Sequence, residues 1–547
     1  MIWLVVIHTR LRHERSRLDR LVQVNVDALA RLALDWEAAP EPPPADVDRR
    51  HPYAFDLDIV GRASLAHRIA TATTRDGWNT LYRWLLEGQA LDDIHRRQTA
   101  IRELSGKIEL RQDVEAAGRA SAGTIPDPAA LLTWAEGQPR LNARRWIRVL
   151  AMVSPATLVI LAVLQFVGIL TYPFWLVPIT VNVALFLIAG AEVADIVARV
   201  APMHKAIAGY RGVFAAIAED DCDAPALRVI RDLLGSGADG ATTQVTRLTR
   251  FSSLALPRAS ILYYPAQMLL LWDIQVLERL ERWQRASGTR VRPWLVAAGE
   301  WDALAALSVL AHDHPSWTFA SIDPGFRKVG AEGLGHPLIE WRQMVRNDVE
   351  VGPAGTFLFV TGSNMSGKST LLRAVGINAV LAMAGGPSCA RSLTMPAVEV
   401  RCCMRVEDSV VAGVSFFMAE LQRLKGVLDA ALEASDRPVL YLLDEIMQGT
   451  NTLERQIASR AVLAQLTGTK AIGAISSHDL GLLVDSRLDD SSVKAHFAEQ
   501  FRNGRTGPEM TFDYKLQPGI ATSTNALKLM AILGFDVPAD TSVAIVD

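Results

Sequence analysis

The feature that most constrains this chain is the stretch TGSNMSGKST at residues 361–370. The apolar run TFLFV at residues 356–360 precedes it and predicts a buried strand, and the helix-forming run LLRAVGINAVLAMAG follows it. The two glycines of the stretch enclose four residues and are followed by Lys and Ser, which is the P-loop pattern. We therefore expect a phosphate-binding loop between a strand and a helix, since a chance glycine turn would not explain both flanking elements.

The residue types of this loop indicate how it would hold a phosphate. Its glycines let the backbone wrap closely, so that N–H groups face the phosphate oxygens. The N-terminus of the following helix adds a partial positive charge. We expect Lys368 to reach the β- and γ-phosphates of a nucleotide and Ser369 to hold Mg²⁺.

Two further apolar runs end in residues that suit phosphate chemistry. The run RPVLYLLDEI predicts a buried strand ending in Asp444, expected to support Mg²⁺ and its waters, and Glu445, expected to polarise the attacking water. A solvated turn is the alternative for such acids. The run AIGAISSHDL predicts another strand that ends near His478, which could contact a γ-phosphate or its water, although a lone histidine is more often structural.

Two polar stretches near these strands predict helix caps. The stretch MQGTNTLERQ at residues 447–456 predicts a loop followed by a capped helix. The stretch GVSFFMAELQRL at residues 413–424 predicts a helix that Ser415 caps and that carries Glu420 and Leu421. Taken alone, both stretches indicate loops and caps rather than chemistry.

Residues 149–191 contain no Asp, Glu, Lys or Arg. We expect a first membrane span near 149–170 and a second near 174–192, with Tyr172 and Trp175 at the membrane–water interface on the far side of the bilayer. The first span would be about 33 Å long as a helix, enough to cross the hydrocarbon core. A buried hairpin in a large soluble core is the alternative. The basic residues that flank the stretch predict a cytosolic location for both of its ends; they are Arg140, Arg144, Arg145, Arg148, Arg199 and Lys205.

The rest of the N-terminal half has the residue pattern of amphipathic helices. Residues 1–40 open with MIWLVVI, which is too short to span a bilayer and has no cleavage site after it. This run is either a membrane-surface foot or the end of a longer segment. APEPPPAD at residues 39–46 predicts a stiff linker, and Leu81, Trp84 and Leu85 recur at the spacing of a core-facing helix.

The later tryptophans and the start of the α/β region can also be placed. Four tryptophans predict packing rather than nucleic-acid stacking, because no dense basic patch interleaves them; they are Trp272, Trp283, Trp294 and Trp301. From about Trp317 onwards, strand and helix alternate, which indicates an α/β domain.

Composition limits the class of protein. A chain of 547 residues is too long for one core, so several domains are expected. Lys and Arg total 56 against 59 Asp and Glu, and the net charge of -3 does not favour binding to nucleic acid through overall charge. The cysteines lack metal-site spacing and are interpreted as reduced residues of a cytosolic body; they are Cys222, Cys389, Cys402 and Cys403.

Taken together, these stretches resemble the MutS family of ABC-type ATPases. GSNMSGKST resembles the family's P-loop, GVSFFMAE its signature segment and LLDEIMQGTNT its Walker B and D-loop run, and SSHD carries the position of its switch histidine. SLAHRIATATTRDGWNTLYRWLL resembles the family's core domain, so the resemblance covers about residues 50–120 and 200–547.

The resemblance implies ATP and Mg²⁺ as ligands and a homodimer with composite sites. Asn364 would contact the γ-phosphate, and Ser415 would cap nucleotide bound on the partner subunit. Catalysis would fall to Lys368, Glu445 and His478, and Mg²⁺ would be held by Ser369 and Asp444. The full set of nucleotide-binding positions is Gly362, Ser363, Asn364, Met365, Ser366, Gly367, Lys368, Ser369, Thr370 and Ser415.

The chain departs from the family pattern at several points. Met447-Gln448 replaces Gly-Arg before the D-loop glycine, which we expect to alter coupling rather than hydrolysis. Near Met344 the family has an aromatic residue that stacks on adenine, so the base preference is left open. We also find no counterpart of the family's mismatch-reading domain, and Phe497-Ala498-Glu499 matches its wedge only by chance because it follows the ATPase motifs.

These observations predict a multidomain chain. A mainly α-helical core and lever region with a transmembrane helical hairpin precedes a C-terminal α/β P-loop ATPase domain of the ABC type. The predicted segments are an N-terminal helix and linker, a MutS-like helical core, the hairpin, a helical lever region and the ATPase domain, at residues 1–46, 47–145, 146–192, 193–316 and 317–547.

Three functions fit this organisation. The first is a dimeric ATP-driven clamp or switch in the cell membrane, with its ATPase domain in the cytoplasm. The second is a soluble mismatch-repair or recombination factor that binds DNA directly, which neither the charge balance nor a reader domain supports. The third is half of an ABC transporter, which one hairpin and the lack of an LSGGQ-like segment disfavour.

Overall fold

The computed structural model describes residues 2–120, 128–139, 145–363, 365–405, 416–433, 436–448, 451–504 and 507–521. The chain forms two compact units, each assembled from segments that are far apart in the sequence. The first unit comprises Met1–Val26, Thr71–Leu81 and Gly106–Ala305, and the second comprises Asp27–Ala70, Tyr82–Ser105 and Ala306–Asp547. The consecutive five-segment division stays a prediction, since the units interleave.

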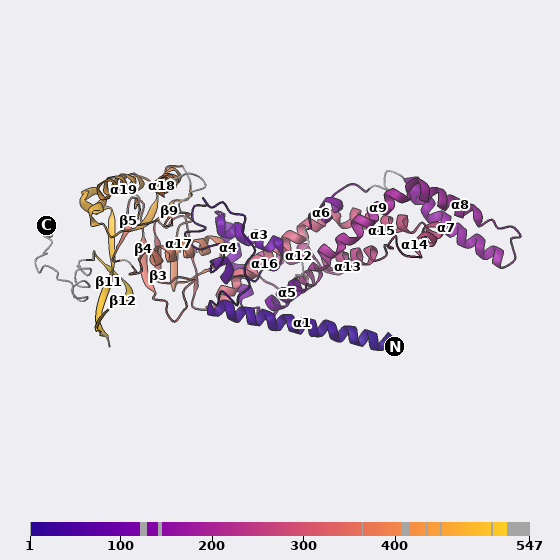
Figure 1. Ribbon diagram of the computed structural model, residues 1–547, viewed down its shortest axis with the longest axis horizontal. Helices are drawn as coiled ribbons and strands as arrows, with labels where there is room; N and C mark the ends of the chain where they lie inside the picture. Colours follow the sequence, from indigo (N-terminus) through magenta and orange to yellow (C-terminus); the bar gives the residue numbers. More distant parts are fainter. Residues whose placement is uncertain are drawn as a thin grey trace, which may run out of the picture. The chain divides into compact units, whose positions relative to one another are not determined.

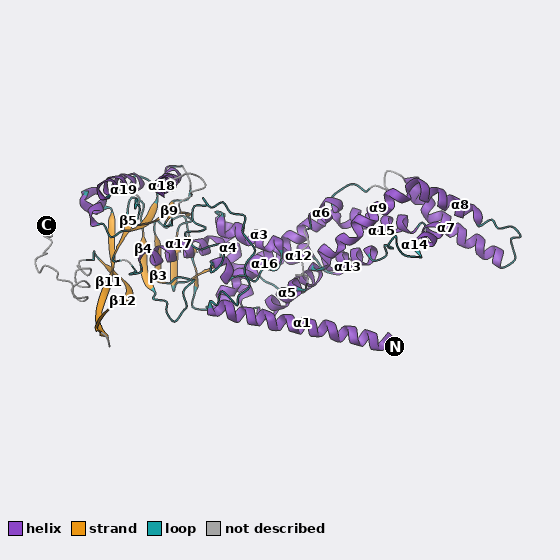
Figure 2. Cartoon of the chain, in the orientation of Figure 1, coloured by secondary structure: helices purple, strands orange, loops and turns teal. Residues whose placement is uncertain are grey.

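The first unit is helical, as the texture of the sequence predicts, and every strand among the described residues belongs to the second unit (Figure 2). Three helices contribute residues to both units; they are α1 (Ile2–Ala33), α3 (Arg75–Leu86) and α16 (Val291–Asp313). The other helices of the first unit are α5 (Ile108–Arg119), α6 (Ala129–Ala135), α7 (Arg145–Phe166), α8 (Leu176–Leu185), η2 (Phe186–Gly190), α9 (Ala191–Val200), η3 (Ala201–Met203), α10 (His204–Ala208), α11 (Tyr210–Ala218), α12 (Pro225–Leu234), η4 (Gly237–Asp239), α13 (Ala241–Ser252), α14 (Tyr263–Leu270), α15 (Trp272–Ser287) and η5 (Gly288–Arg290).

The charge-free stretch forms two helices that pack against each other, α7 and α8 (Figure 1). The Ser154 hydroxyl donates to the carbonyl of Pro178 at 3.2 Å, and the Trp175 indole donates to Gln165 near the connecting turn. The helix that begins at Leu176 does not end at residue 192 as predicted, because η2 and α9 continue it to Val200. In α9 the apolar face is buried while Asp195 and Arg199 are exposed, so the change in composition marks a change of surroundings rather than a helix end.

Length and composition make three helical stretches of the described residues suitable for crossing a membrane. In the most apolar windows of Trp146–Phe166 and Leu176–Ala208, only 28% and 33% of the residues are buried. In the third, Trp272–Asp313, 83% are buried, so its apolar residues pack inside the protein. The two poorly buried stretches are those predicted as the hairpin.

The second unit places its ATPase motifs on a six-stranded sheet with the order β12-β11-β5-β10-β9-β8. Strands β11, β5, β10, β9 and β8 are parallel, and β12 runs antiparallel at the edge. Smaller sheets have the orders β2-β7-β3-β4 and β1-β6. The strands are β1 (Thr318–Phe319), β2 (Ser321–Ile322), β3 (Val329–Leu334), β4 (Asn347–Val351), β5 (Phe357–Thr361), β6 (Pro387–Ser388), β7 (Ser392–Met395), β8 (Glu399–Cys403), β9 (Val439–Asp444), β10 (Ile472–Ser476), β11 (Ser492–Gly504) and β12 (Gly507–Pro518).

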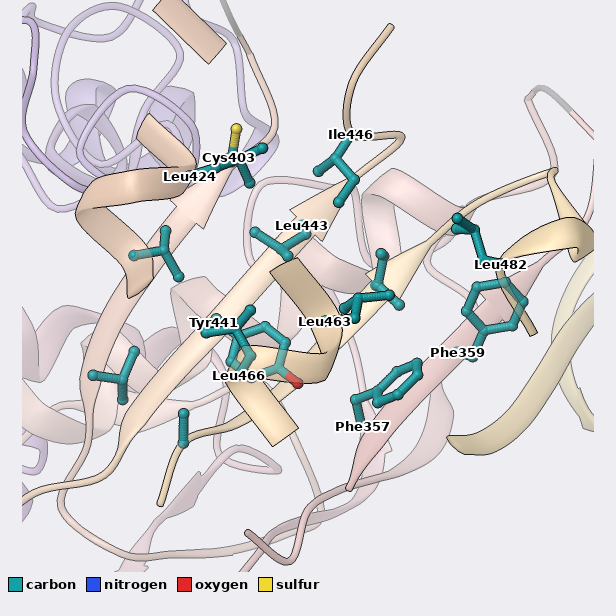
Figure 3. Close-up of a cluster of buried hydrophobic side chains, with 14 of the residues drawn as sticks. Phe357, Phe359, Cys403, Leu424, Tyr441, Leu443, Ile446, Leu463, Leu466 and Leu482 are labelled. Carbon is teal, nitrogen blue, oxygen red and sulfur yellow. The ribbon is translucent and has the colours of Figure 1, made fainter. Parts of the chain in front are cut away.

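Helices cover the six-stranded sheet and bury its apolar side chains. These helices and the others of this unit are α2 (Leu65–Arg68), α4 (Leu91–Ser105), α17 (Lys368–Ala384), α18 (Phe416–Leu432), α19 (Thr452–Thr467), η6 (Leu480–Val484) and α20 (Ser486–Asp490). Figure 3 shows one core layer, in which Tyr441 and Leu443 of β9 point toward Leu463 and Leu466 of α19. The intervening Leu442 points the other way, where its side chain would lie 2.8 Å from a Cβ on Gly376 of α17, as alternation along a strand requires.

Several smaller predictions can be compared with the structure. Leu81, Trp84 and Leu85 are buried, as predicted. The proline-rich segment, predicted as a stiff linker, is held by a hydrogen bond from the hydroxyl of Tyr82 to the Pro43 carbonyl at 2.6 Å. Three of the four tryptophans named above are buried and Trp272 is half-buried, which confirms their packing role. All four cysteines are buried, and none of them forms a disulfide.

Candidate functional site

The P-loop lies where the sequence predicts it, between β5 and α17. All five residues of β5 are buried, so the strand fixes the start of the loop. Gly362 and Gly367 have φ values of 144° and 108°, which favour glycine. A Cβ on Gly362 would lie only 2.7 Å from Ser366 Oγ. The loop can therefore close this tightly only because residue 362 has no side chain.

Lys368 is the first residue of α17 and lies folded over the loop. Its ammonium donates to the carbonyls of Gly362 and Ser363, at 2.9 Å each, and its side chain is only 4% exposed. The same nitrogen is 3.5 Å from Glu445 Oε1. The ammonium is thus held at the mouth of the loop, where a phosphate oxygen would be a stronger partner than a neutral carbonyl.

The two predicted strand ends meet the P-loop because β5, β10 and β9 are parallel neighbours. The Ser476 hydroxyl at the end of β10 donates to Asp444 at the end of β9. The Ser477 N–H donates to the Val360 carbonyl at 3.1 Å, which joins β10 to β5 just before the loop. The carboxyl ends of these strands therefore form one polar edge.

Glu445 lies at the centre of this edge. Its Oε1 is 3.6 Å from His478 Nδ1 as well as close to Lys368, and its Oε2 accepts from the Gln448 amide at 2.8 Å. Its backbone N–H donates to the Ser476 carbonyl at 3.0 Å, which fixes a residue with a φ of 46°. The three residues predicted to be catalytic are thus brought together, while Gln448 was named from the sequence only as a departure from the family pattern.

Two acids, the buried Glu420 and the half-buried Asp479, anchor the loops around Glu445. Glu420 in α18 accepts from the Met447 N–H, so the helix after the predicted signature segment is tied to the segment after Walker B. Burial by itself would raise the pKa of Asp479, but hydrogen bonds from Gln456, the Gly481 N–H and Arg455 outweigh it and lower the pKa below its usual range. Asp479 therefore stays ionised and holds the start of α19 beside His478.

A pocket of about 770 Å³ opens next to these groups, a size typical of small-molecule sites. Lys368, Ser369 and Thr370 line one side of it, together with Asp444 and Glu445. Ser369 and Asp444, the two residues predicted to hold Mg²⁺, therefore line the same cavity.

The other side of the pocket is less polar and was only partly foreseen. Met344, the position discussed for adenine stacking, lines the pocket as a thioether, which can pack against an aromatic base. Phe497 and Tyr514 also line it, from β11 and β12, which periodicity alone could not place beside the P-loop. Burial lowers the pKa of His336 to about 4, so this lining histidine is neutral at pH 7.

The residues present fit a nucleotide with Mg²⁺. The Ser366 hydroxyl is buried and has no hydrogen-bond partner among the described residues, and a Cβ on Gly362 would come within 2.7 Å of it. A hydroxyl and a carboxylate, from Ser369 and Asp444, are the oxygen ligands that Mg²⁺ prefers. Of the predicted site residues, Asn364 and Ser415 lie outside the described residues, as do Gly449 and Thr450 of the D-loop.

Fold and site together define a P-loop ATPase domain. Residues 358–542 match the family model for MutS domain V. This chain therefore carries a MutS-type ATPase domain, which hydrolyses ATP, behind a helical N-terminal region.

The chain is also similar to proteins that are named for DNA mismatch repair. The chain is 32% identical to "DNA mismatch repair protein MSH6" of Arabidopsis thaliana over 39% of its own length and 17% of that protein. It is 31% identical to "DNA mismatch repair protein MutS 2" of Halobacterium salinarum, over 43% of its own length and 27% of that protein. It is 28% identical to "DNA mismatch repair protein MutS" of Myxococcus xanthus, over 48% of its own length and 29% of that protein. The matched stretch thus spans less than a third of each of these relatives.

Proposed function

We propose that this chain is a membrane-anchored, dimeric, MutS-like ATPase that works as an ATP-driven clamp or switch. The observation that carries the proposal is the meeting of Lys368, Glu445 and His478 beside one pocket. An ammonium, a carboxylate and an imidazole at the end of parallel strands suit attack of water on a γ-phosphate, in which the protein supplies positioning and charge neutralisation.

The proposed reaction assigns a separate role to each of these groups. The loop N–H groups and Lys368 hold the phosphates, and Ser369 and Asp444 hold Mg²⁺, which neutralises phosphate charge when it is bound. Glu445 accepts a proton from the attacking water, whose oxygen bonds to the γ-phosphorus while the bond to the β–γ bridging oxygen breaks and ADP leaves. His478, 53% exposed, would contact the γ-phosphate from the open side of the site.

The dimer is proposed because the site is open on the side of His478. A second copy would place its Ser415 against the nucleotide, so that each ATP is held between two chains. Binding of ATP would close the pair, and hydrolysis would reopen it and move the helical regions. Gln448 donates a hydrogen bond to Glu445 and is one of the two residues at which this chain departs from the family pattern before the D-loop glycine. Its position suits a role in coupling the two sites.

Membrane anchoring is proposed from the exposed surface of α7 and α8. A helix of 22 residues such as α7 is about 33 Å long, against about 30 Å for the hydrocarbon core of a bilayer. Large apolar side chains cover the exposed surface of the hairpin, and such a surface would promote aggregation if it faced water. They include Val149, Met152, Val153, Val159, Ile160, Val163 and Phe166 of α7, and Val177 of α8 with Leu187 and Ile188 of η2. We place both ends of the hairpin and the ATPase domain in the cytoplasm, because basic residues flank the hairpin.

Membrane extraction tests the anchoring. We expect the wild-type chain to stay in the membrane pellet after alkaline carbonate treatment. The double variant Val159→Arg, Val163→Arg places two charges on the outward face of α7, where each costs about 2.5–3.5 kcal/mol in a membrane span, and it should move largely to the supernatant.

The matched control is Val229→Arg on α12, which is 58% exposed, close to the 54% of Val159 and of Val163, and lies outside the hairpin. This variant should extract like the wild type. Release of the wild-type chain by carbonate, with its ATPase activity intact, would contradict the anchoring and would leave the ATPase assignment standing.

DNA binding and transport are not part of this proposal. The names of the relatives concern DNA mismatch repair, but the similarity covers 17% of the first of them and 27% of the second. The matched family model covers the ATPase domain only, so it carries no information on what the helical regions hold.

A further inference from the structure

A second apolar element lies beside the hairpin. Between Arg258 and Asp273 the sequence reads ASILYYPAQMLLLW and contains no charged residue. This segment, residues 259–272, includes α14 and ends in a sharp turn at Leu271, which has a φ of 48°. As a helix, this segment would be about 21 Å long, which is too short to cross a bilayer. A search for helices long enough to span a membrane therefore does not find it.

The outward face of this segment continues the apolar surface of the hairpin. Helix α14 contacts both α7 and α8, as Figure 1 shows. Ile261 is 91% exposed and Leu262 is 63% exposed, values far above those of core residues. The other large apolar side chains exposed on the segment are Tyr264, Met268, Leu269 and Leu270.

The direction of the segment follows from two contacts with the long helix that starts at α8. Arg258 pairs with Asp195 of α9 at 2.5 Å, and the amide of Asn182 in α8 donates to the carbonyl of Met268 at 3.0 Å. Asp195 and Asn182 are about 20 Å apart along a helix. The segment therefore runs along this helix from its charged end toward the connecting turn of the hairpin.

The last backbone carbonyls of α14 all have hydrogen-bond donors within the protein. In a helix exposed to solvent, water satisfies the last four carbonyls, whereas in hydrocarbon every backbone polar group needs an internal partner. Here each of the four has one. The acceptor carbonyls and their donors are Gln267 with the Leu271 N–H, Met268 and Leu269 with the Asn182 amide, and Leu270 with the Gln275 amide, at 2.9, 3.0, 3.1 and 2.8 Å.

Asn182 gives the clearest sign of the surroundings. It is fully buried, at 0% exposure, on helix α8, which carries no charged residue, and its amide donates to two carbonyls of α14. A polar side chain on a membrane span is costly unless it faces the protein interior and finds a partner. Its two hydrogen bonds therefore hold the C-terminal end of α14 against α8.

We propose that residues 259–272 form a third membrane-embedded element, a half-depth segment that packs along the second helix of the hairpin and is covered by lipid acyl chains. This inference rests on the proposed anchoring through the hairpin. Lipid, rather than a protein partner, is the proposed occupant because the exposed apolar side chains belong to a segment that packs against the hairpin helices, and because the last carbonyls of α14 have partners within the protein. The Arg258–Asp195 pair then lies at the cytoplasmic headgroup level.

Site-directed fluorescence quenching tests this element. Single cysteines replace Ile261, Leu269, Val163 or Val229 in the full chain, which is reconstituted in phosphatidylcholine nanodiscs and labelled with an environment-sensitive dye. The four native cysteines are buried, so wild-type protein serves as the labelling blank. Nitroxide lipids, spin-labelled near the headgroup or near the bilayer centre, report lipid contact, and iodide reports contact with water.

We expect lipid-borne nitroxide to quench the labels at 261 and 269 as it does at 163, while iodide quenches only the label at 229. The label at 261 should respond more to the headgroup nitroxide and that at 269 more to the deep one. Quenching by lipid at 163 but by iodide at 261 and 269 would overturn this element and leave the anchoring in place. Protection of 261 and 269 from both quenchers would assign the face to a protein partner and overturn the lipid contact. Absence of lipid quenching at 163 would overturn the anchoring, and this inference with it.

Discussion

Replacing Glu445 with glutamine is expected to stop ATP turnover and leave ATP binding intact. The carboxylate is held at the site by Lys368, His478 and Gln448, and an amide of the same shape can still accept the hydrogen bond from Gln448. Only the ability to take a proton from water is lost. Because a positioned general base contributes about 10²- to 10⁴-fold, we expect kcat to fall by that factor.

Phosphate release under single-turnover conditions measures the loss, and equilibrium binding of a fluorescent ATP analogue measures what is kept. The same substitution at Glu350, whose side chain is 64% exposed in an ion pair with Lys328, serves as the control and should not change either quantity. Turnover at the wild-type rate in Glu445→Gln would remove this residue as the base, even if the variant binds ATP normally.

The Lys368→Ala variant is expected to lose affinity for ATP, the step that precedes hydrolysis. Its ammonium lies between two loop carbonyls, and no other lysine or arginine lines the pocket among the described residues. A hydrogen bond to a charged group contributes about 1.5–3 kcal/mol, which corresponds to a Kd for ATP that is about 10- to 100-fold higher. Isothermal titration with ATP and Mg²⁺ measures the change directly.

A surface lysine of the same unit provides the control. Lys425→Ala removes an ammonium that is 72% exposed and pairs only with Asp429 one helical turn away, so its Kd for ATP should equal that of the wild type. An unchanged Kd in Lys368→Ala would mean that the nucleotide is held elsewhere, and the P-loop assignment would then be wrong.

The strands that flank the candidate site could be predicted because their sequence signals are local. Apolar runs such as FLFV and VLYLL define buried strands, and the parallel order of β5, β10 and β9 then forces Asp444, Glu445 and His478 to the P-loop edge. The pocket wall was harder to foresee. Tyr514 reaches the pocket from the edge strand β12, where the Asn347 amide donates to its carbonyl at 3.0 Å, and such long-range pairing leaves no local trace.

The helical regions show the same division between local and long-range information. The absence of charge predicted the hairpin, but the second helix runs past Glu192 because packing against α15 continues to support it. Residues 259–272 escaped notice because a short apolar run looks like an ordinary amphipathic helix, and only the contacts of Asn182 reveal its surroundings. The hydrogen bond from Tyr82 that fixes the proline-rich segment could not be foreseen either, since it comes from a distant helix.

The most direct test of the central claim, that two chains share each ATP, mixes two inactive variants. Lys368→Ala removes the P-loop cation, and Ser415→Ala removes the residue proposed to act on the partner's nucleotide. In a head-to-tail pair of one copy of each, one site keeps both groups intact and the other loses both.

We expect each detergent-solubilised variant alone to be nearly inactive. An equimolar mixture should recover about one quarter of the wild-type ATPase rate, since about half of the pairs are mixed and each has one intact site. A mixture that is no more active than the mean of the two separate variants, while crosslinking shows that mixed pairs form, would contradict the composite site.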